Sequence, residues 1–443
     1  MVIGGSAAGM AAAARAKRKK PDLEVVVFER SKYVSYAPCG LPYLYEGLID
    51  SFDRLIYYTA DYFRRERGID VRTRHEVVDI DHSSRQVIAI DLDSGKEVRV
   101  EYDKLVLATG GISLKPRAEG VDLSGIYTIR TLDDGERFFK ALTKSNTVGI
   151  IGVGFGGLEM AEAITKMGKK VVLIGKSDHV LPGFDREFIE VLNNVIVNKG
   201  ISLRLEERVV SFEGDDHVRK IVTDKGEYKV DSVLISIGIK PNTHFAKKLG
   251  VKLGVTGAIK TNEYMQTSVE DVYSAGDNTE TINLVTGKPA YIPSAPTANK
   301  MGRVAGDNIA GGTMKFPGVV GTVILKFFNE HIGKAGLSYN EALREGFNAS
   351  YVDISHNTRS HYYPGAKKVR VRLVFDLDTH RVLGGQFMGY EGVIERVFAL
   401  TAVITSKMTV EDLATLDLPY NPPFTPVWDP LIVAASVAMR KLS

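Results

Sequence analysis

The feature that most constrains this chain is a strand–turn–helix pattern that occurs twice. In each copy a short apolar run leads into a glycine-rich turn, and a stretch of helical periodicity follows. The first copy covers residues 2–9 and the second covers residues 148–157. Continuous apolar runs of this kind are typical of parallel strands that are buried on both faces. The repeat therefore predicts an α/β chain with two Rossmann-like dinucleotide-binding units.

The second copy is the cleaner dinucleotide-binding signature. Its turn reads Gly-Val-Gly-Phe-Gly-Gly and lies between an apolar strand and a helical stretch that runs to Met167. Gly152 allows the tight turn, and Gly154 lets the backbone approach a pyrophosphate. The following helix offers free N–H groups and the positive end of its dipole. In this context a dinucleotide site is favoured over a purely structural turn, with contacts from Gly152, Val153, Gly154, Phe155, Gly156 and Gly157.

The end of the next strand bears on the choice between NADH and NADPH. This position normally carries an Asp or Glu, which binds the ribose 2′-hydroxyl of NAD. Here it is Gly175, and Lys176 follows. This position holds no carboxylate that would repel the 2′-phosphate of NADPH, and Lys176 could pair with that phosphate. We therefore expect that NADPH is accepted or even preferred. The alternative is that Lys176 is an ordinary solvated loop lysine.

The first copy departs from the usual glycine pattern. Ser6 stands where the middle glycine is usual, so the turn alone is a poor match. Glu29 compensates, because it ends the next apolar strand 20 residues after Gly9, where a ribose-binding acid belongs. Two dinucleotide sites in one chain suggest two different nucleotides, such as a flavin and a nicotinamide.

The order of the apolar strands suggests how the chain is divided. A chain of 443 residues should form about three domains. The strand around residue 273 returns the chain to the first unit after the second unit is complete. We therefore expect a first dinucleotide-binding domain at residues 1–112 and 242–320, a second at 113–241, and an α/β tail at 321–443.

The composition excludes several classes of partner. Lys and Arg number 57 against 54 Asp and Glu, so the net charge of +3 gives no reason to expect nucleic acid. No apolar run reaches the roughly 18 residues of a membrane span. The N-terminus is apolar first and basic after, the reverse of a secretory signal. The nine histidines show no metal-ligand spacing. We expect a cytoplasmic protein that binds no nucleic acid, membrane or metal.

The chain has one cysteine, Cys39, in the segment Ser-Tyr-Ala-Pro-Cys-Gly-Leu-Pro-Tyr. Pro38, Gly40 and Pro42 bracket it in a constrained loop just after a nucleotide-binding strand, whereas a structural cysteine usually has apolar periodic neighbours. A nearby helix start would stabilise its thiolate. We therefore interpret Cys39 as the reactive centre rather than as a small core residue.

These motifs together resemble the pyridine nucleotide–disulfide oxidoreductases. More narrowly, the chain is similar to their single-cysteine branch of coenzyme A disulfide reductases, NAD(P)H-dependent sulfur reductases, NADH oxidases and NADH peroxidases. The resemblance covers essentially the whole chain, and only the combination of motifs is specific. The segments that carry it are the first turn with Glu29, residues 35–43, 108–110, 152–157 with Glu159, 274–277, and Tyr420-Asn421-Pro422-Pro423.

The resemblance implies two Rossmann-like domains, for FAD and NAD(P)H, and a C-terminal α/β dimerisation domain. Glu29 would hold the adenosine ribose of FAD. Thr109 and Gly110 would line the pyrophosphate, Asp277 would bind the ribityl-phosphate region, and NAD(P)H would stack near Glu159. The implied cofactor-binding residues outside the second turn are Gly4, Gly5, Ala7, Ala8, Gly9, Glu29, Arg30, Cys39, Val77, Ala108, Thr109, Gly110, Glu159, Gly175, Lys176, Gly238, Gly276, Asp277, Ala295 and Tyr420.

A single cysteine changes what the resemblance implies for the chemistry. The dithiol members use a Cys-x4-Cys pair, and this chain has no second cysteine. Oxidised Cys39 must then be a sulfenic acid or a mixed disulfide with an outside thiol. In the peroxidases and water-forming oxidases a His in the first glycine turn assists the sulfenic acid, and Ala7 stands there instead. This difference argues against efficient peroxide or four-electron oxygen chemistry.

The first helix favours coenzyme A as the outside thiol. Ala11, Arg15 and Arg18 lie at i, i+4 and i+7, on one helix face, and neighbouring lysines extend the basic patch. Coenzyme A reductases grip the nucleotide's phosphates with this helix. The alternative is a solvated basic helix end, which suits the helix dipole. The implied coenzyme A-binding residues are Ala11, Arg15, Arg18, Lys19 and Ser35.

Two tail tyrosines, Tyr362 and Tyr420, match tyrosines that reach the neighbouring subunit's cysteine site in coenzyme A disulfide reductases. With Cys39 they form the implied catalytic set, since a phenol could donate a hydrogen bond or proton to a departing thiolate. Ordinary interface packing is the alternative. The implied assembly is a homodimer, which could pair further into a dimer of dimers. The aromatic stretch at residues 57–63 favours helix packing over a base-stacking platform.

The resulting hypothesis is an FAD enzyme that passes electrons from NAD(P)H through the flavin and Cys39 to a small sulfur substrate. That substrate would be coenzyme A disulfide, coenzyme A persulfide or polysulfide. A second interpretation is an NAD(P)H oxidase that makes mainly peroxide. A third is a non-enzymatic flavoprotein redox sensor.

Overall fold

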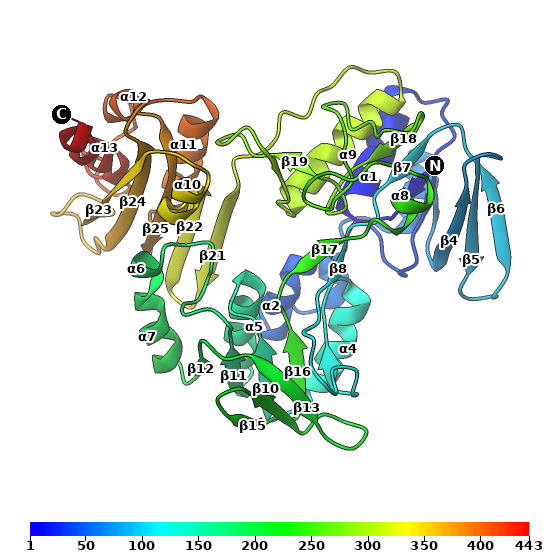
Figure 1. The fold of residues 1–443 in the computed structure, drawn as a ribbon, viewed down its shortest axis with the longest axis horizontal. Coiled ribbons are helices and arrows are strands. Elements are labelled where there is room, and N and C mark those ends of the chain that lie inside the picture. The colour runs from blue at the N-terminus through cyan, green and yellow to red at the C-terminus, as the bar shows by residue number, and fades with distance from the viewer. Residues whose placement is uncertain (443) are drawn as a thin grey trace.

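The computed structural model describes residues 1–442 and is organised around three five-stranded sheets (Figure 1). The first sheet is parallel, with the strand order β18-β7-β1-β2-β3. One of its strands comes from a distant part of the sequence. The strands are β1 (Val2–Ile3), β2 (Val26–Phe28), β3 (Asp70–Arg72), β7 (Leu105–Leu107) and β18 (Val272–Ser274).

Two helices on one face of this sheet approach so closely that glycine is required. Helix α1 (Ala7–Lys19) packs against α9 (Ala295–Ile309). A Cβ atom at Gly302 or at Gly306 would lie 2.2 Å from a backbone oxygen of α1. This contact joins the N-terminal segment to a segment that follows the second domain, and it holds the first domain together.

Smaller elements complete the first domain and connect it to the second. β8 (Gly111–Ser113) and β17 (Ile239–Pro241) pair antiparallel and carry the chain out and back. The other elements are α2 (Leu41–Tyr45), α3 (Ala60–Arg67), α8 (His244–Lys248), the meander β4 (His75–Asp81), β5 (Gln86–Asp91) and β6 (Glu97–Glu101), and the hairpin β19 (Thr281–Ile282) and β20 (Pro289–Ala290).

The second domain repeats the parallel design with the order β12-β11-β10-β16-β9. Its sheet consists of β9 (Ile126–Tyr127), β10 (Thr147–Ile151), β11 (Lys170–Ile174), β12 (Ser202–Arg204) and β16 (Ser232–Ile235). The accompanying elements are α4 (Leu132–Leu142), α5 (Phe155–Lys166), α6 (Arg186–Ile189), α7 (Val191–Asn198), and the small antiparallel sheet β13 (Val209–Glu213), β14 (Lys220–Thr223) and β15 (Glu227–Lys229).

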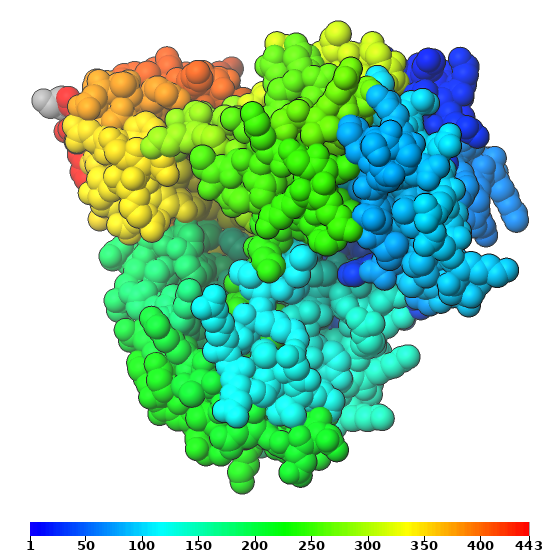
Figure 2. Space-filling view, turned by 45° about the vertical axis from the view of Figure 1, so that its right-hand side comes forward, coloured from blue at the N-terminus to red at the C-terminus, as the bar shows by residue number. Residues whose placement is uncertain are grey.

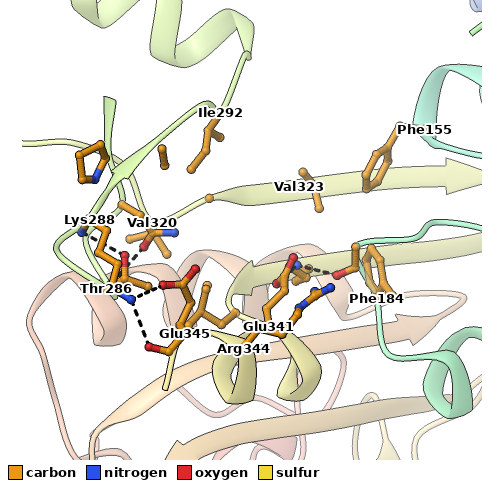
Figure 3. Close-up of a pocket in the computed structure, with 18 residues that line it drawn as sticks. Phe155, Phe184, Thr286, Lys288, Ile292, Val320, Val323, Glu341, Arg344 and Glu345 are labelled. Carbon is orange, nitrogen blue, oxygen red and sulfur yellow. Dashed lines mark hydrogen bonds and ion pairs between the residues drawn. The ribbon is translucent and has the colours of Figure 1, made fainter. Parts of the chain in front are cut away.

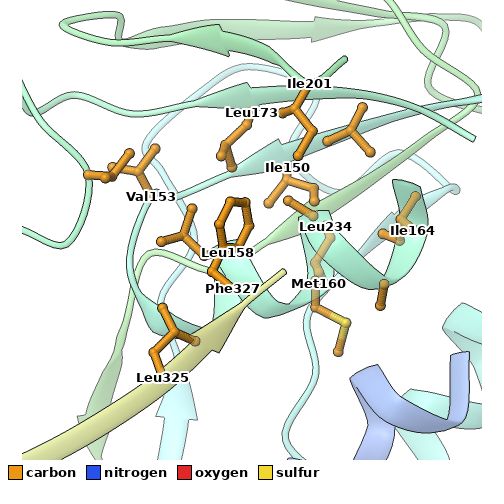
Figure 4. Packing of buried hydrophobic residues seen from close by; sticks show 14 of the residues in the cluster. Ile150, Val153, Leu158, Met160, Ile164, Leu173, Ile201, Leu234, Leu325 and Phe327 are labelled. Carbon is orange, nitrogen blue, oxygen red and sulfur yellow. The ribbon is translucent and has the colours of Figure 1, made fainter. Parts of the chain in front are cut away.

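The tail is an antiparallel sheet with helices, in the order β21-β22-β25-β24-β23. Its first strand also enters the core of the second domain, where Leu325 and Phe327 pack beside Leu158 (Figure 4). The elements are β21 (Thr322–Phe327), β22 (Glu330–Gly336), α10 (Tyr339–Arg344), β23 (Ala349–Asn357), β24 (Lys368–Asp376), β25 (Val382–Gly389), α11 (Val393–Thr405), α12 (Val410–Ala414) and α13 (Pro430–Leu442).

The predicted α/β fold class is confirmed, with two parallel dinucleotide-type sheets and an α/β tail. The predicted domain limits near residues 112 and 241 fall in the β8–β17 ribbon, and they stay a prediction. In the space-filling view the tail, in yellow, lies against the teal part of the second domain (Figure 2). Within residues 1–442, every helix is too short or too polar to cross a membrane.

The α1–α9 contact leads to a stability prediction. Replacing Gly306 with Ala should lower the apparent Tm by about 5 °C, because the added methyl group must push the two helices apart. The loss should appear although Ala is the better helix former by about 1 kcal/mol. Arg303→Ala, on the exposed face of the same helix, is the control and should leave Tm almost unchanged. Thermal unfolding that cannot distinguish the two variants would contradict this account of the packing.

Candidate active site

Many of the predicted site residues surround one cleft of about 950 Å³ beside the first sheet. The cleft is bordered by the first glycine turn, the N-terminal part of α9 and the segment that carries the cysteine. Predicted residues that line it are Ala7, Ala8, Ala11, Arg18, Ser35, Cys39, Ala108, Gly110, Gly276, Asp277 and Ala295.

The first glycine turn is built by backbone contacts that leave no space for side chains. Gly4 has a positive φ of 107°, and a Cβ there would lie 2.2 Å from the carbonyl oxygen of Ala108. A Cβ at Gly9 would lie 1.8 Å from the oxygen of Gly4. The start of α1 is therefore held against the strand ends with its first N–H groups directed at the cleft, which is the arrangement that binds a pyrophosphate.

Glu29 lies directly beneath this turn. Its carboxylate accepts hydrogen bonds from the backbone N–H of Gly5 at 2.7 Å and of Ser31 at 2.8 Å. Burial raises the pKa of Glu29, and these two hydrogen bonds oppose the rise. A fixed acid beneath a glycine turn and beside a large cleft fits the adenosine end of a dinucleotide, and its predicted role as ribose ligand stays a prediction.

Cys39 lies in a 3₁₀ turn, Pro38–Gly40, that leads into α2. Its thiol is exposed to the cleft. Burial of the surrounding segment raises the pKa of Cys39, the carboxylate of Glu159 raises it further, and Arg130 opposes them. A backbone hydrogen bond at Cys39 lowers the pKa of the thiol, in the direction expected of a helix start, but desolvation and the neighbouring negative charge outweigh it.

Asp277 lies across the cleft and is joined to the second domain. It forms an ion pair with Arg130 at 2.8 Å, between the loop before α4 and the loop after β18. The hydroxyl of Tyr291 donates to the backbone oxygen of Asp277 at 2.8 Å, and that of Thr109 donates to the oxygen of Asn242 at 2.7 Å. Sequence reasoning missed Arg130, which has no motif around it and reaches the site only through the fold.

The second glycine turn repeats the geometry of the first. A Cβ at Gly157 would lie 2.0 Å from the oxygen of Gly152, so helix α5 starts directly above β10. Gly154, at the N-cap, has open space beside it. Lys176 is exposed just after β11. The turn therefore presents an accessible helix N-terminus with a cation near the end of the next strand.

Glu159 lies on α5, one turn into the helix. Burial and then the negative charge of Glu162 raise the pKa of Glu159 to about 7. Both protonation states of this carboxyl group are therefore populated near neutral pH. Its carboxylate also raises the pKa of Cys39, which places a titrating acid within electrostatic reach of the thiol.

Comparisons with known proteins agree with this geometry. The sequence pattern of the pyridine nucleotide-disulphide oxidoreductases matches residues 1–302, and that of their dimerisation domain matches residues 322–431. The chain belongs to this family. It is therefore an oxidoreductase, and the resemblance to this family found in the sequence is confirmed.

Three relatives illustrate the range of the family. The chain is 46% identical to the CoA-dependent NAD(P)H sulfur oxidoreductase of Pyrococcus furiosus over 440 residues, 99% of this chain and 98% of the relative. It is 36% identical to an NADH oxidase of Methanocaldococcus jannaschii over 446 residues, covering 100% and 99%. A solved NAD-dependent persulfide reductase from A. fulgidus superposes with a TM-score of 0.96 at 39% identity, covering 99% of this chain and 83% of that one.

The basic residues of α1 in this oxidoreductase are divided between two environments. Ala11 and Arg18 line the cleft, but Arg15 is turned toward α9 and binds Asp307 at 2.6 Å. Lys19 lies 3.5 Å from the same carboxylate. Arg15 and Lys19 do not line the cleft, because a buried acid 292 positions from Arg15 binds both cations. Lys17 lines the cleft together with Arg18.

The aromatic stretch at residues 57–63 is divided between the core and the cleft. Phe63 is buried in the core as expected, but Tyr57, Tyr58 and Tyr62 line the cleft wall facing α1. The rings of Tyr58 and Tyr62 stack with their centroids 4.6 Å apart. Arg67 donates to the hydroxyl of Tyr62 at 2.9 Å, so the wall is both aromatic and basic.

The two tail tyrosines come together although 58 positions separate them. The hydroxyls of Tyr362 and Tyr420 are 3.0 Å apart, and both side chains are exposed. The hydrogen bond lowers the pKa of Tyr362 and raises the pKa of Tyr420. Neither tyrosine is among the residues that line the Cys39 cleft of the same chain.

The remaining predicted cofactor residues have varied environments. Val77 is buried in β4, and Arg30 is exposed 3.7 Å from Glu76. Gly238 has a positive φ of 105° just before β17. Across residues 1–442, His, Cys, Asp and Glu side chains do not gather in a group of three or more that could hold a metal ion.

Proposed function

We propose that this oxidoreductase uses FAD to pass electrons from NAD(P)H through Cys39 to coenzyme A disulfide, coenzyme A persulfide or polysulfide. The observation that carries the proposal is the position of the lone, exposed cysteine. It lies in a cleft whose turn and acid fit a dinucleotide and whose outer walls are basic and aromatic.

FAD would be held by the first glycine turn, Glu29 and the residues around Asp277. Bound there, it would take a hydride from NAD(P)H and return the electron pair to sulfur. The protein's own part is to hold Cys39 open to the cleft and to keep Glu159, whose pKa is about 7, within electrostatic reach of the thiol, where it could store or release a proton.

Cys39 would act as the nucleophile. Its thiolate attacks one sulfur of the acceptor, a new S–S bond forms, and coenzyme A leaves as a thiolate that takes a proton. The mixed disulfide is then cleaved by the electron pair from NAD(P)H, which regenerates Cys39. The net reaction converts NAD(P)H, one proton and a disulfide into NAD(P)⁺ and two thiols. With a persulfide acceptor, the products are a thiol and hydrogen sulfide.

The outer part of the cleft supports coenzyme A as the thiol. Arg18, Lys17 and Arg67 surround it with positive charge, which suits a molecule with several phosphates. The stacked rings of Tyr58 and Tyr62 offer a face for an adenine base. The relatives named as CoA-dependent sulfur and polysulfide reductases support the same choice.

The Tyr362–Tyr420 pair supports a homodimer in which each Cys39 site receives these two residues from the partner. The pair is exposed and hydrogen-bonded, so one phenol can donate outward while the other supports it. Phe398, Phe424 and Trp428 are also exposed on the tail, as expected for an interface. A dimer of dimers and a cytoplasmic location remain parts of the proposal.

An NAD(P)H oxidase is the second candidate, because relatives named as NADH oxidases also align along the whole chain. Peroxide formed directly at a flavin would not need Cys39. Ala7 stands where an assisting histidine is expected in the oxidases, which disfavours this candidate. A redox sensor would show negligible steady turnover with small sulfur acceptors.

The Cys39→Ser variant separates these candidates. It should keep FAD bound but lose turnover of coenzyme A disulfide by about 10³-fold or more, because no other thiol can form the mixed disulfide. NAD(P)H-dependent peroxide formation should persist in the same variant. Steady-state assays with the two acceptors check this. Disulfide turnover at wild-type rates would rule out the mechanism.

The two arginines of α1 form a matched pair for testing the acceptor site. Arg18→Met should raise KM for coenzyme A disulfide about 10-fold, because a phosphate loses a charged hydrogen bond. Arg15→Met should leave this KM within twofold, since Arg15 already binds Asp307. Equal effects of both substitutions on KM would show that the cleft face of α1 does not bind the acceptor.

Lys176 is the residue proposed to favour NADPH. Lys176→Glu should lower the ratio of kcat/KM for NADPH over NADH about 10-fold or more, because a carboxylate would face the 2′-phosphate. The matched control is Lys170→Glu. Lys170 is also exposed, and it begins β11, the strand that Lys176 follows. A large NADH preference in the wild-type enzyme, or an unchanged ratio in Lys176→Glu, would contradict the proposal.

A further inference from the structure

A polar row crosses one face of the tail sheet and meets the second domain. Lys334 on β22 pairs in register with Gln386 on β25, and Gln386 pairs with Arg372 on β24. Arg372 in turn pairs with Asp353 on β23 and binds its carboxylate at 2.7 Å. Lys334, Gln386 and Arg372 are buried although they are polar or charged. Such a row is costly to bury unless each group has a partner.

The partner of this row is the loop between β11 and α6. Most of the contacts are made by Asp185, at the end of the loop. Asp185 is 0% exposed. Its backbone N–H donates to the side chain of Gln386 at 2.9 Å. Its carboxylate accepts from the backbone N–H groups of Tyr339 and Asn340, both at 3.0 Å, and from Gln386 at 2.5 Å, and it lies 3.2 Å from Arg372.

The loop is bound on both sides of Asp185 as well. Lys334 donates to the oxygen of Gly183 at 2.6 Å, and Arg370 donates to the oxygen of Phe188 at 3.1 Å. We call this set the Asp185 joint: Asp185, Lys334, Arg370, Arg372 and Gln386. Burial alone would raise the pKa of Asp185, but the hydrogen bonds from Asn340, Tyr339, Gln386 and Arg372 hold it below its usual value, so the joint stays ionic.

The same loop reaches the second glycine turn. The backbone N–H of Leu181, which has a positive φ of 52°, donates to the oxygen of Val153 at 2.9 Å. Phe184 and Phe155 stand at one end of the adjoining cavity of about 520 Å³, with ring centroids 6.3 Å apart (Figure 3). The loop begins at Gly175 and Lys176, so it links the nucleotide-binding turn to the tail sheet through a short, hydrogen-bonded path.

We propose that the Asp185 joint is a positioning element for the pyridine nucleotide. By fixing the far end of the loop on the tail sheet, it sets the place of the glycine turn and of Lys176 relative to the rest of the enzyme. The tail therefore does more than provide a surface for a partner subunit. This inference rests on the family's use of a pyridine nucleotide and is independent of the identity of the sulfur acceptor.

The test compares two substitutions on one strand of the holoenzyme. Arg370→Met removes the contact with Phe188 but leaves the bonds of Asp185 in place. Lys368→Met also replaces a cation with Met, two residues earlier on the same face of β24. It touches none of the described loop contacts and is the control. Asp185→Asn, a stronger change, is measured in parallel.

The readouts are the Kd of NADH and NADPH for the oxidised enzyme, and amide hydrogen exchange in residues 176–188. Arg370→Met should raise the nucleotide Kd several-fold and Asp185→Asn about 10-fold, with faster exchange in the loop. Lys368→Met should change neither quantity. KM for the sulfur acceptor should stay within twofold in all three variants, and Arg370→Lys should restore much of the affinity.

An unchanged nucleotide Kd in Arg370→Met and Asp185→Asn, with only a lower Tm, would overturn the proposal and leave the joint a stabilising contact. If Asp185→Asn does not fold, the comparison of Arg370→Met with its control Lys368→Met decides by the same criterion. Because Kd is measured without any acceptor, failure of the proposed sulfur chemistry would not alter this result.

Discussion

The backbone contact between α1 and α9 is the interaction on which the site depends. Gly302 and Gly306 allow α9 to lie against the carbonyl groups of α1, and no larger residue fits there without separating the helices. The same approach brings Gly276 beside Ala8, where a Cβ would lie 2.9 Å from that methyl group. One end of the cleft is thus assembled from segments at the beginning and in the middle of the chain, and Cys39 lies between them.

The cleft combines two electrostatic environments. Around Cys39, burial and the carboxylate of Glu159 favour the neutral thiol. Farther out, Arg18, Lys17 and Arg67 provide positive charge with stacked tyrosines beside them. A polyanionic thiol fits this gradient, because its phosphates can bind at the outer wall while its sulfur reaches the cysteine. Because no second thiol exists in the chain, any disulfide formed by Cys39 must include a thiol from outside it.

Features that depend on a short stretch of sequence could be predicted. The two glycine turns, Glu29 and the loop of Cys39 lie where local patterns placed them, because turn geometry and strand ends are determined by neighbouring residues. The ion pairs of Arg15 and Lys19 with Asp307 could not be predicted, because Asp307 lies on another helix far along the chain. Periodicity identifies a helix face but does not reveal which side a distant acid will occupy.

Tertiary arrangement also explains what the sequence could not indicate. Arg130 meets Asp277 across two domains, and the residues of the Asp185 joint come from a loop and three strands. These contacts have no spacing signature. The tyrosines at 57, 58 and 62 form a wall of the cleft because the opposite face of that segment, with Phe63, fills the core.

The central claim is that Cys39 works through a mixed disulfide with coenzyme A. The most direct measurement is the mass of the protein, and of its Cys39 peptide, after exposure to coenzyme A disulfide and again after NAD(P)H. We expect an adduct of the mass of coenzyme A on Cys39 that disappears on reduction. An enzyme that turns over the disulfide while Cys39 carries no adduct, even in the absence of NAD(P)H, would contradict it.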